Sequence, residues 1–407
     1  MSVMIDPLLA PQHERSDRTN SIEFNDHEPP LAPDSELDRF GRRRTRRWIG
    51  RITVGVTVVL LPPLYSYTSA LTGPGSDSLQ ARTVEWARDN HLGPVVDRLE
   101  NWYYSRHQAV VGGVPSVSVL PTAPRVDTPV VSGPAPLQTP AAVPIPGEGA
   151  WTPLGPLING KADAFVTSIR PDNVHTSSID EVVNFDPKFF SFRAYPGTKI
   201  PQPWDRPDYV ELNRRPSLVA AFSGGFRLRD SGGGMILGGA VIQPMTNGIA
   251  TMSIDKNGVP NIGMWGRDIV DSSSLDSARQ NLDPIVDNGI ANPDLLTDSN
   301  RKWGFTGPKN KTAVWRSGAG ITADGHLIWV GGPGLTIEAL AQTLVRAGAI
   351  RGMQLEINQE WVQLNTYSTN SSGKTTGKRL MSGMQHNGNR WLTEDTRDFV
   401  AAFVRSP

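Results

Sequence analysis

The chain of 407 residues has no cysteine, which excludes disulfides, thiolate zinc sites and a cysteine nucleophile. It also has no excess of either charge, because 40 Lys and Arg balance 40 Asp and Glu. This balance argues against a nucleic-acid partner. No HExxH motif is present, and the histidines after residue 150 (His175, His326 and His386) do not share the spacing of metal ligands. We therefore predict no nucleic-acid partner, no metal and no cofactor.

Residues 1–38 lack the sustained periodicity of a folded domain, and a long uncharged run follows further along the chain. Prolines, acids and an arginine cluster in residues 1–47 predict a disordered tail. The twenty residues 52–71 carry no charge, and a helix of that length spans ~30 Å, the thickness of a bilayer core. Arginines flank only its N-terminal side, which predicts a cytoplasmic tail, a single-pass anchor at 48–71 in the cell membrane, and an extracytoplasmic C-terminal domain.

Two segments separate this run from the rest of the chain. Residues 72–107 contain two amphipathic stripes interrupted by Gly93 and Pro94, which predicts a short helical stalk. This stalk either packs on itself or on the main domain, or it binds a membrane surface or a partner. Residues 108–150 hold nine prolines and no aromatic residue, so they bury too little apolar surface to offset the entropy of ordering. We predict a Pro-rich linker there.

Residues 151–407 are long enough for one sizeable core. Short apolar runs typical of β-strands occur at 165–169, 191–195, 218–222, 236–242 and 249–254. One helix is predicted, with Thr336 as its N-cap and Gly348 after its end. This order predicts an α+β fold in which helices pack on a mixed β-sheet, preceded by one transmembrane helix and the Pro-rich linker.

Two glycine-rich segments are candidate binding sites. The first, 220–227, is an apolar run that ends in Ser223, Gly224 and Gly225, where backbone could approach a ligand closely. Arg227 follows and could hold a phosphate; the alternative is an ordinary tight turn. The second, 331–336, leads into the helix and is either an anion site at the helix N-terminus or a strand-to-helix connection.

The alternating run 353–358 carries the candidate catalytic acid. Its polar face holds Glu356 and Asn358. Glu356 could act as a general base or nucleophile, with Asn358 orienting it or a water molecule. Equally, Glu356 could be a buried structural acid that pairs with Arg316 or Arg351. The residues alone leave both interpretations open.

The segments 220–226, 312–330, 335–355 and 397–399, in this order, resemble the phosphodiester glycosidase family. That family includes the enzyme that uncovers mannose 6-phosphate on lysosomal hydrolases, and it cleaves the bond between a sugar anomeric carbon and a phosphate diester. The resemblance spans most of 160–407. The arginine-flanked run, the segment 278–282 and the preference for arginine over lysine resemble an actinobacterial branch.

The sequence departs from the family pattern at two places. Ser223 stands where the family has asparagine, and 355–361 replaces a glycine-rich loop of the family. The second change retains a carboxylate at Glu356 but removes the close backbone cradle that glycines allow.

We therefore predict a hydrolase-like domain that cleaves a sugar-1-phosphodiester in a wall polymer or surface glycan. Glu356 and Asn358 would be catalytic, and substrate would be held by Ser223, Gly224, Gly225, Arg227 and Arg316. The alternatives are a glycan-phosphate-binding module without turnover and an envelope assembly protein. Catalysis requires Glu356, Arg316 and Arg227 to meet in one cleft.

Overall fold

The computed structural model describes residues 61–115, 133–155, 164–297, 302–304 and 310–405. The chain divides into two units, Met1–Leu64 and Tyr65–Pro407, and the elements described here belong to the second. The predicted tail at 1–47 lies outside the described residues, so its disorder stays a prediction.

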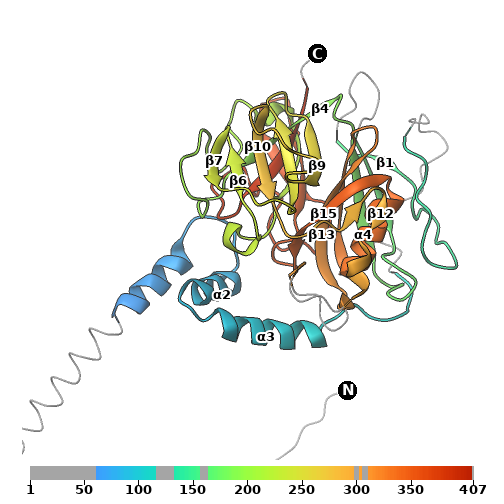
Figure 1. Cartoon of the computed structure of the whole chain (residues 1–407), viewed down its shortest axis with the longest axis horizontal. Coiled ribbons are helices and arrows are strands. Elements are labelled where there is room, and N and C mark those ends of the chain that lie inside the picture. Colours follow the sequence, from blue (N-terminus) through green and yellow to red (C-terminus); the bar gives the residue numbers. More distant parts are fainter. Residues whose placement is uncertain (1–60, 116–132, 156–163, 298–301, 305–309, 406–407) are drawn as a thin grey trace, which may run out of the picture. The chain divides into compact units, whose positions relative to one another are not determined.

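Three sheets form the domain (Figure 1). The first has eight strands, in the order β1 (Thr152–Pro153), β2 (Ala164–Ile169), β3 (Asp180–Phe185), β14 (Leu327–Leu335), β13 (Val314–Thr322), β15 (Ala349–Ile357), β11 (Val286–Asp287) and β12 (Ile290–Ala291). The second has five strands, in the order β7 (Ala240–Gln243), β6 (Met235–Leu237), β10 (Leu275–Gln280), β8 (Ala250–Asp255) and β9 (Pro260–Met264). The third also has five, in the order β17 (Thr375–Arg379), β16 (Leu364–Thr369), β5 (Leu218–Ser223), β18 (Phe399–Val404) and β4 (Phe190–Tyr195).

The predicted α+β fold with a mixed sheet is wrong, because the chain is mostly β-sheet with few helices. Every pairing between the named strands of the described residues is antiparallel. The helix α4 (Ile337–Arg346) connects β14 to β15, a pattern that indicates a parallel pair when it is read from sequence. Here β13 lies between those two strands and runs antiparallel to both.

Individual elements agree with the local sequence. The predicted strands correspond to β2, β4, β5, the β6–β7 hairpin and β8. The predicted helix is α4, whose N-cap Thr336 accepts a hydrogen bond from the Ala339 backbone N–H at 3.0 Å.

The predicted membrane anchor finds no support in the described part of the chain. Residues 48–60 of the predicted anchor lie outside that part, and residues 61–72 are helical. No helix among the described residues has both the length and the apolar character needed to cross a bilayer. The expectation of a transmembrane helix before the domain is corrected accordingly.

The central strands of the eight-stranded sheet are buried on both faces, because a hydrophobic cluster lies on each side of the sheet. Leu327 and Trp329 of β14 face a cluster shared with the other two sheets, while Ile328 and Val330 face α4. A strand covered on both sides reads as a continuous apolar run, as 327–330 does. The eight-stranded sheet therefore has two sides, one facing α4 and one facing the other sheets.

The segment predicted as a stalk forms the helices α2 (Leu79–Asp89) and α3 (Gly93–Arg106). We call these two helices the helical hairpin. Within the predicted linker, residues 133–150 contact the sheet domain, since the Glu148 carboxylate ion-pairs with Arg170 at 2.7 Å. Part of the Pro-rich stretch is therefore fixed to the domain, by this buried carboxylate and by Leu137, which packs against the core cluster on the α4 side.

Candidate functional site

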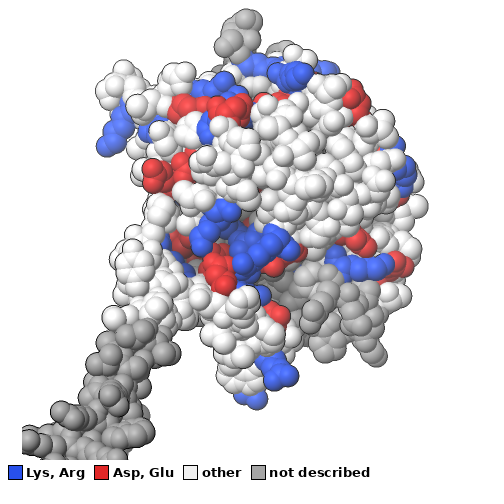
Figure 2. Space-filling model, turned by 60° about the vertical axis from the view of Figure 1, so that its left-hand side comes forward, with Lys and Arg blue, Asp and Glu red and all other residues white. Residues whose placement is uncertain are grey.

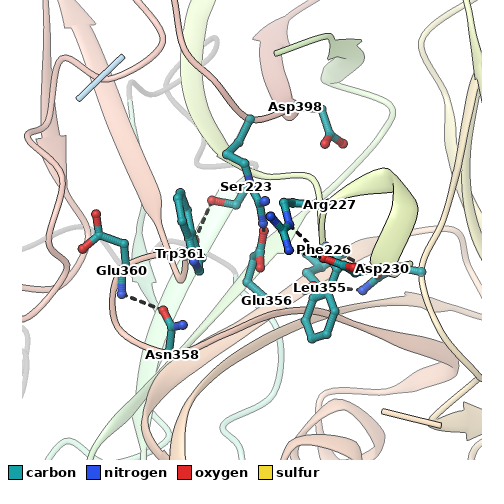
Figure 3. A network of polar contacts seen from close by, with 12 residues as sticks. Ser223, Phe226, Arg227, Asp230, Leu355, Glu356, Asn358, Glu360, Trp361 and Asp398 are labelled. Atoms are coloured by element: carbon teal, nitrogen blue, oxygen red, sulfur yellow. Dashed lines mark hydrogen bonds and ion pairs between the residues drawn. The ribbon is translucent and has the colours of Figure 1, made fainter. Parts of the chain in front are cut away.

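The end of β5 brings the first predicted segment next to β18. Ser223 is buried and its hydroxyl donates a hydrogen bond to the Trp361 carbonyl at 2.7 Å (Figure 3). The Gly224 N–H donates to the Asp398 carbonyl at 2.9 Å, so it is already used within the domain. A Cβ at Gly224 would lie 2.4 Å from an Asp398 carboxylate oxygen. Gly225 has φ +143°, a conformation that favours glycine. Close packing of β5 against its neighbours accounts for both glycines.

A register shift decides where the Glu356 side chain points. On β13, Arg316 pairs with Ile357 and Gly318 pairs with Gln354. Two residue steps on β13 thus match three on β15, which is a β-bulge in β15. A bulge re-aims the side chains that follow it. The alternation predicted for 353–358 therefore breaks between Gln354 and Glu356.

Arg316 and Glu356 lie on opposite sides of the eight-stranded sheet. Arg316 is fully buried on the α4 side, where it donates to the Leu335 carbonyl at 3.0 Å and to the Gln354 side-chain oxygen at 3.2 Å. Gly318, two residues along the same strand, faces the Leu340 side chain of α4. Burial lowers the pKa of Arg316 to about 9. The structure therefore does not bring Arg316 together with Glu356, either in a shared cleft or in the ion pair that was one of the two alternatives.

The partner of Glu356 is Arg397, just before β18. Glu356 is 1% exposed, and its Oε1 lies 3.2 Å from Arg397 Nη2. The guanidinium of Arg397 also stacks 4.4 Å from the centre of the Trp361 ring. Burial raises the pKa of Glu356 to about 8, while the charge of Arg397 opposes the rise. Glu356 is thus a buried acid, as one of the two sequence interpretations allowed, but with a different arginine.

A second ion pair lies beside the first. Arg279 of β10 contacts Asp398 at 3.0 Å, and both side chains are buried. The Asp398 charge also raises the pKa of Glu356, which places the two pairs in one network. The network alternates two carboxyl groups and two guanidinium groups from three sheets. If it opens to solvent, it offers two cations for a phosphate and one carboxyl group for proton transfer.

Sequence reasoning did not assign Arg279 and Arg397 to the site, although both segments contribute to the family resemblance. Arg279 lies inside a strand whose neighbours are buried, and Arg397 precedes the apolar run of β18. A charged residue at such a position needs a buried partner. That signal could have identified both arginines, but not their carboxylate partners.

Asn358 does not orient Glu356 through its side-chain oxygen, which belongs to a turn. It has φ +69°, and its backbone N–H donates to the Trp315 carbonyl at 2.9 Å. Its Oδ1 accepts from the Glu360 N–H at 3.0 Å (Figure 3). Asn is tolerated in this left-handed conformation and closes such turns. The structure therefore supports a local structural role for Asn358.

Arg227 lies in the loop after β5 and is close to the network. It ion-pairs with Asp230 at 2.7 Å (Figure 3) and with Asp89 of α2 at 3.7 Å. Burial lowers its pKa, and the charges of Asp230 and Glu85 oppose this effect. Of the two arginines predicted to hold phosphate, only Arg227 is on the Glu356 side.

The helical hairpin covers this site. Glu85 of α2 is buried, and its carboxylate lies 3.3 Å from Arg397 Nη1. The Ser78 N–H donates to the Glu360 carboxylate at 2.9 Å, and Thr396 donates to Asp77 at 2.5 Å. Figure 2 shows basic and acidic side chains gathered next to one another on one face of the molecule. In this conformation the Glu356 side chain is buried among the described residues.

The second glycine-rich segment belongs to β14, where its glycines allow neighbouring side chains to pack closely against the strand. A Cβ at Gly331 would lie 2.3 Å from the Trp329 ring, and one at Gly332 would lie 1.8 Å from the Asp180 carboxylate. A Cβ at Gly334 would lie 2.4 Å from Ser178. The space next to these glycines is thus filled by side chains of the domain itself. This geometry favours the strand-to-helix connection over an anion site.

The neighbouring Glu181 makes stability depend on pH. It is buried, it accepts a hydrogen bond from Ser168 at 2.9 Å, and burial raises its pKa to about 8. The native state therefore keeps this proton up to about pH 8, whereas the unfolded chain releases it near its ordinary value of 4.5. The free energy of unfolding should fall between these two pH values. We expect the free energy of unfolding of Glu181→Gln to exceed that of the wild type by roughly 4 kcal/mol at pH 8 and to match it near pH 4, measured by urea unfolding. A difference that is the same at both pH values would contradict this role.

No family model matches the chain, and no curated protein matches it. Among solved structures, it is a distant structural neighbour of the catalytic domain of zebrafish N-acetylglucosamine-1-phosphodiester alpha-N-acetylglucosaminidase, a structure auto-inhibited by a pro-peptide. The identity is 15% and the TM-score 0.40, over 60% of this chain and 82% of that one. A hypothetical protein from Synechocystis is similar at 12% identity and a TM-score of 0.35, over 62% and 64% of the two chains.

Both likenesses concern the fold alone, and neither assigns chemistry to the site at these TM-scores. The actinobacterial branch, the domain boundaries and the location of the protein stay predictions.

Proposed function

We propose that the domain hydrolyses the bond between a sugar C1 atom and a phosphate diester. Glu356 would be the general base, and Arg397 and Arg279 would hold the phosphate. The observation that carries this proposal is the buried network in which the Glu356 carboxyl lies 3.2 Å from Arg397, beside the Arg279–Asp398 pair. The order of sequence segments supports the same class of reaction.

The chemistry uses groups that the domain provides. The Glu356 carboxylate takes a proton from water, the water oxygen bonds to C1, and the bond from C1 to the phosphate oxygen breaks. The phosphate monoester leaves with the bonding electrons, and the guanidinium groups of Arg397 and Arg279 stabilise its charge. The proton on Glu356 then passes to solvent. Burial favours this role, since a carboxylate with a raised pKa is a stronger base.

The substrate class follows from the charges at the site. A phosphate diester carries one negative charge, which suits two arginines that are each partly neutralised by a carboxylate. Arg227 lies on the same side and would contact a neighbouring phosphate of a polymer. A wall or surface glycan with sugar-1-phosphodiester links would supply such a ligand.

Arginine variants test this assignment against the one made from sequence. We expect Arg397→Lys to weaken the binding of a sugar-1-phosphodiester or its turnover by about 10- to 100-fold, because Lys cannot reproduce two directed contacts. Arg316→Lys is the matched control, since Arg316 is equally buried but lies on the α4 side. Release of free sugar by the full chain is the measurement, and thermal melting shows that both variants fold. If the two variants lose the same share of binding or turnover, the assignment of Arg397 to the site is contradicted.

The second candidate function is binding without turnover, which the replacement of the family's glycine loop by 355–361 favours. Saturable binding of a sugar-1-phosphodiester with no free sugar released would select it. In that case Arg397→Lys should still weaken binding, whereas replacing Glu356 by Gln should change the dissociation constant little.

A further inference from the structure

The helix α2 places two carboxylates on the cations of the candidate site. Glu85 lies 3.3 Å from Arg397, and Asp89 lies 2.6 Å from Arg229 and 3.7 Å from Arg227. Residues four apart lie on the same face of a helix, so one face of α2 carries both acids toward the site. The arrangement gives each acid the position that an anionic ligand would take.

Glu85 is unusual for a helix at the surface of a domain. Together with Ala81 it is one of the two buried residues of α2. Its carboxylate contacts Arg397 on Nη1 while Glu356 contacts the same guanidinium on Nη2. Arg397 therefore joins the catalytic candidate to an acid of the hairpin, and Glu85 uses the guanidinium nitrogen that Glu356 leaves.

The hairpin is held mainly by polar contacts. Val96 is the buried residue of α3, and the large apolar side chains Leu79, Leu99 and Trp102 are 68%, 62% and 53% exposed. An element that buries little apolar surface opens at a lower free energy than the core strands. Several of its ion pairs are partly exposed, as for Asp89 and Arg229, and such pairs contribute little stability.

We propose that α2 is a displaceable acidic cover, in which Glu85 and Asp89 compete with the phosphate of the ligand for Arg397 and Arg227. This inference rests on the proposed function, because it assigns a regulation to the same site. The covered state protects the buried network from solvent and keeps the site inactive. A polyanionic ligand would favour the uncovered state, since it replaces both carboxylates at once.

The test compares two double variants of the full chain. Glu85→Gln with Asp89→Asn removes both competing charges without changing side-chain size. Asp271→Asn with Asp324→Asn removes the same number of charges from exposed positions between strands and serves as the control. The probe is glucose 1-phosphate, whose dissociation constant is measured by calorimetry. Hydrogen exchange of residues 79–89 reports whether the helix detaches.

We expect the Glu85/Asp89 variant to bind the probe about tenfold more tightly and to exchange faster in α2, while the control matches the wild type. If the Glu85/Asp89 variant binds the probe no more tightly than the wild type, the proposal that α2 covers the site is contradicted. The single variant Asp89→Asn, at a half-exposed position, should show part of the effect even if the double variant folds poorly.

The same measurements separate this inference from the proposed function. The double variant could bind the probe more tightly while no variant releases free sugar from a sugar-1-phosphodiester. That result would support the role of α2 as a cover and contradict the proposal that the domain is a hydrolase. Equal hydrolysis by the wild type and the double variant would retain the hydrolase and reject the cover.

Discussion

Glu356→Gln is expected to lower the release of free sugar by about 10²- to 10⁴-fold, the usual contribution of a general base. The amide of Gln fits the same space and can still contact Arg397, but it cannot take a proton from water. For the wild type, kcat/KM should rise with pH toward about pH 8, because the base acts only after it has lost its own proton and burial raises its pKa to about 8. The variant should show no such rise.

Glu181→Gln is the matched control for this experiment. Glu181 is also a buried glutamate on a strand of the eight-stranded sheet, and burial likewise raises its pKa to about 8. It contacts Ser168 rather than an arginine of the site. The control should retain wild-type turnover. If both variants lose activity equally, Glu356 acts through the fold and the catalytic assignment is rejected.

Gly332→Ala is expected to destabilise the domain by about 3 kcal/mol and to lower Tm by about 5–10 °C. A Cβ at this position would lie 1.8 Å from the Asp180 carboxylate and 2.7 Å from the Asp180 Cα, so backbone as well as side chain must move. Asp180 is itself fully buried in β3, and the central strands cannot separate to make room. Thermal melting of the full chain gives the measurement.

Gly93→Ala is the control for that substitution. Gly93 begins α3, and nothing lies within 4 Å of the Cβ that the variant adds. Alanine at a helical position should leave Tm unchanged or raise it slightly. A Gly332 variant as stable as the Gly93 variant would show that β3 and β14 can shift apart, contrary to the packing described here.

The two functional proposals can be judged separately. The network of Glu356, Arg397, Asp398 and Arg279 stands on contacts among the sheets, independently of the helical hairpin. The cover depends on Glu85 and Asp89 of α2. A closed site is compatible with hydrolysis only if α2 moves, and for this reason hydrogen exchange of α2 is as informative as an activity assay.

Local sequence determined much of the secondary structure. Apolar runs gave the positions of β2, β4, β5 and β8, and Thr336 marked the start of α4. These features depend on residues a few positions apart, within the range over which caps, turns and side-chain alternation act. Local sequence did not determine the class of the fold. A strand–helix–strand order predicts two neighbouring parallel strands, but it is equally compatible with a third strand that lies between them and runs antiparallel to both.

Only the tertiary structure decided which residues form the site. A single bulge in β15 turned Glu356 away from Arg316, and a one-residue change of register reverses the face on which a side chain lies. The partners of the buried acids are distant in the chain: Glu85 is 312 residues from Arg397, and Arg279 is 119 from Asp398. Charge pairing has no periodicity along the sequence, because it depends on which elements the sheets bring together. The sequence alone therefore identified Glu356 as a candidate acid, while Arg397 and the acidic cover became apparent only in the folded chain.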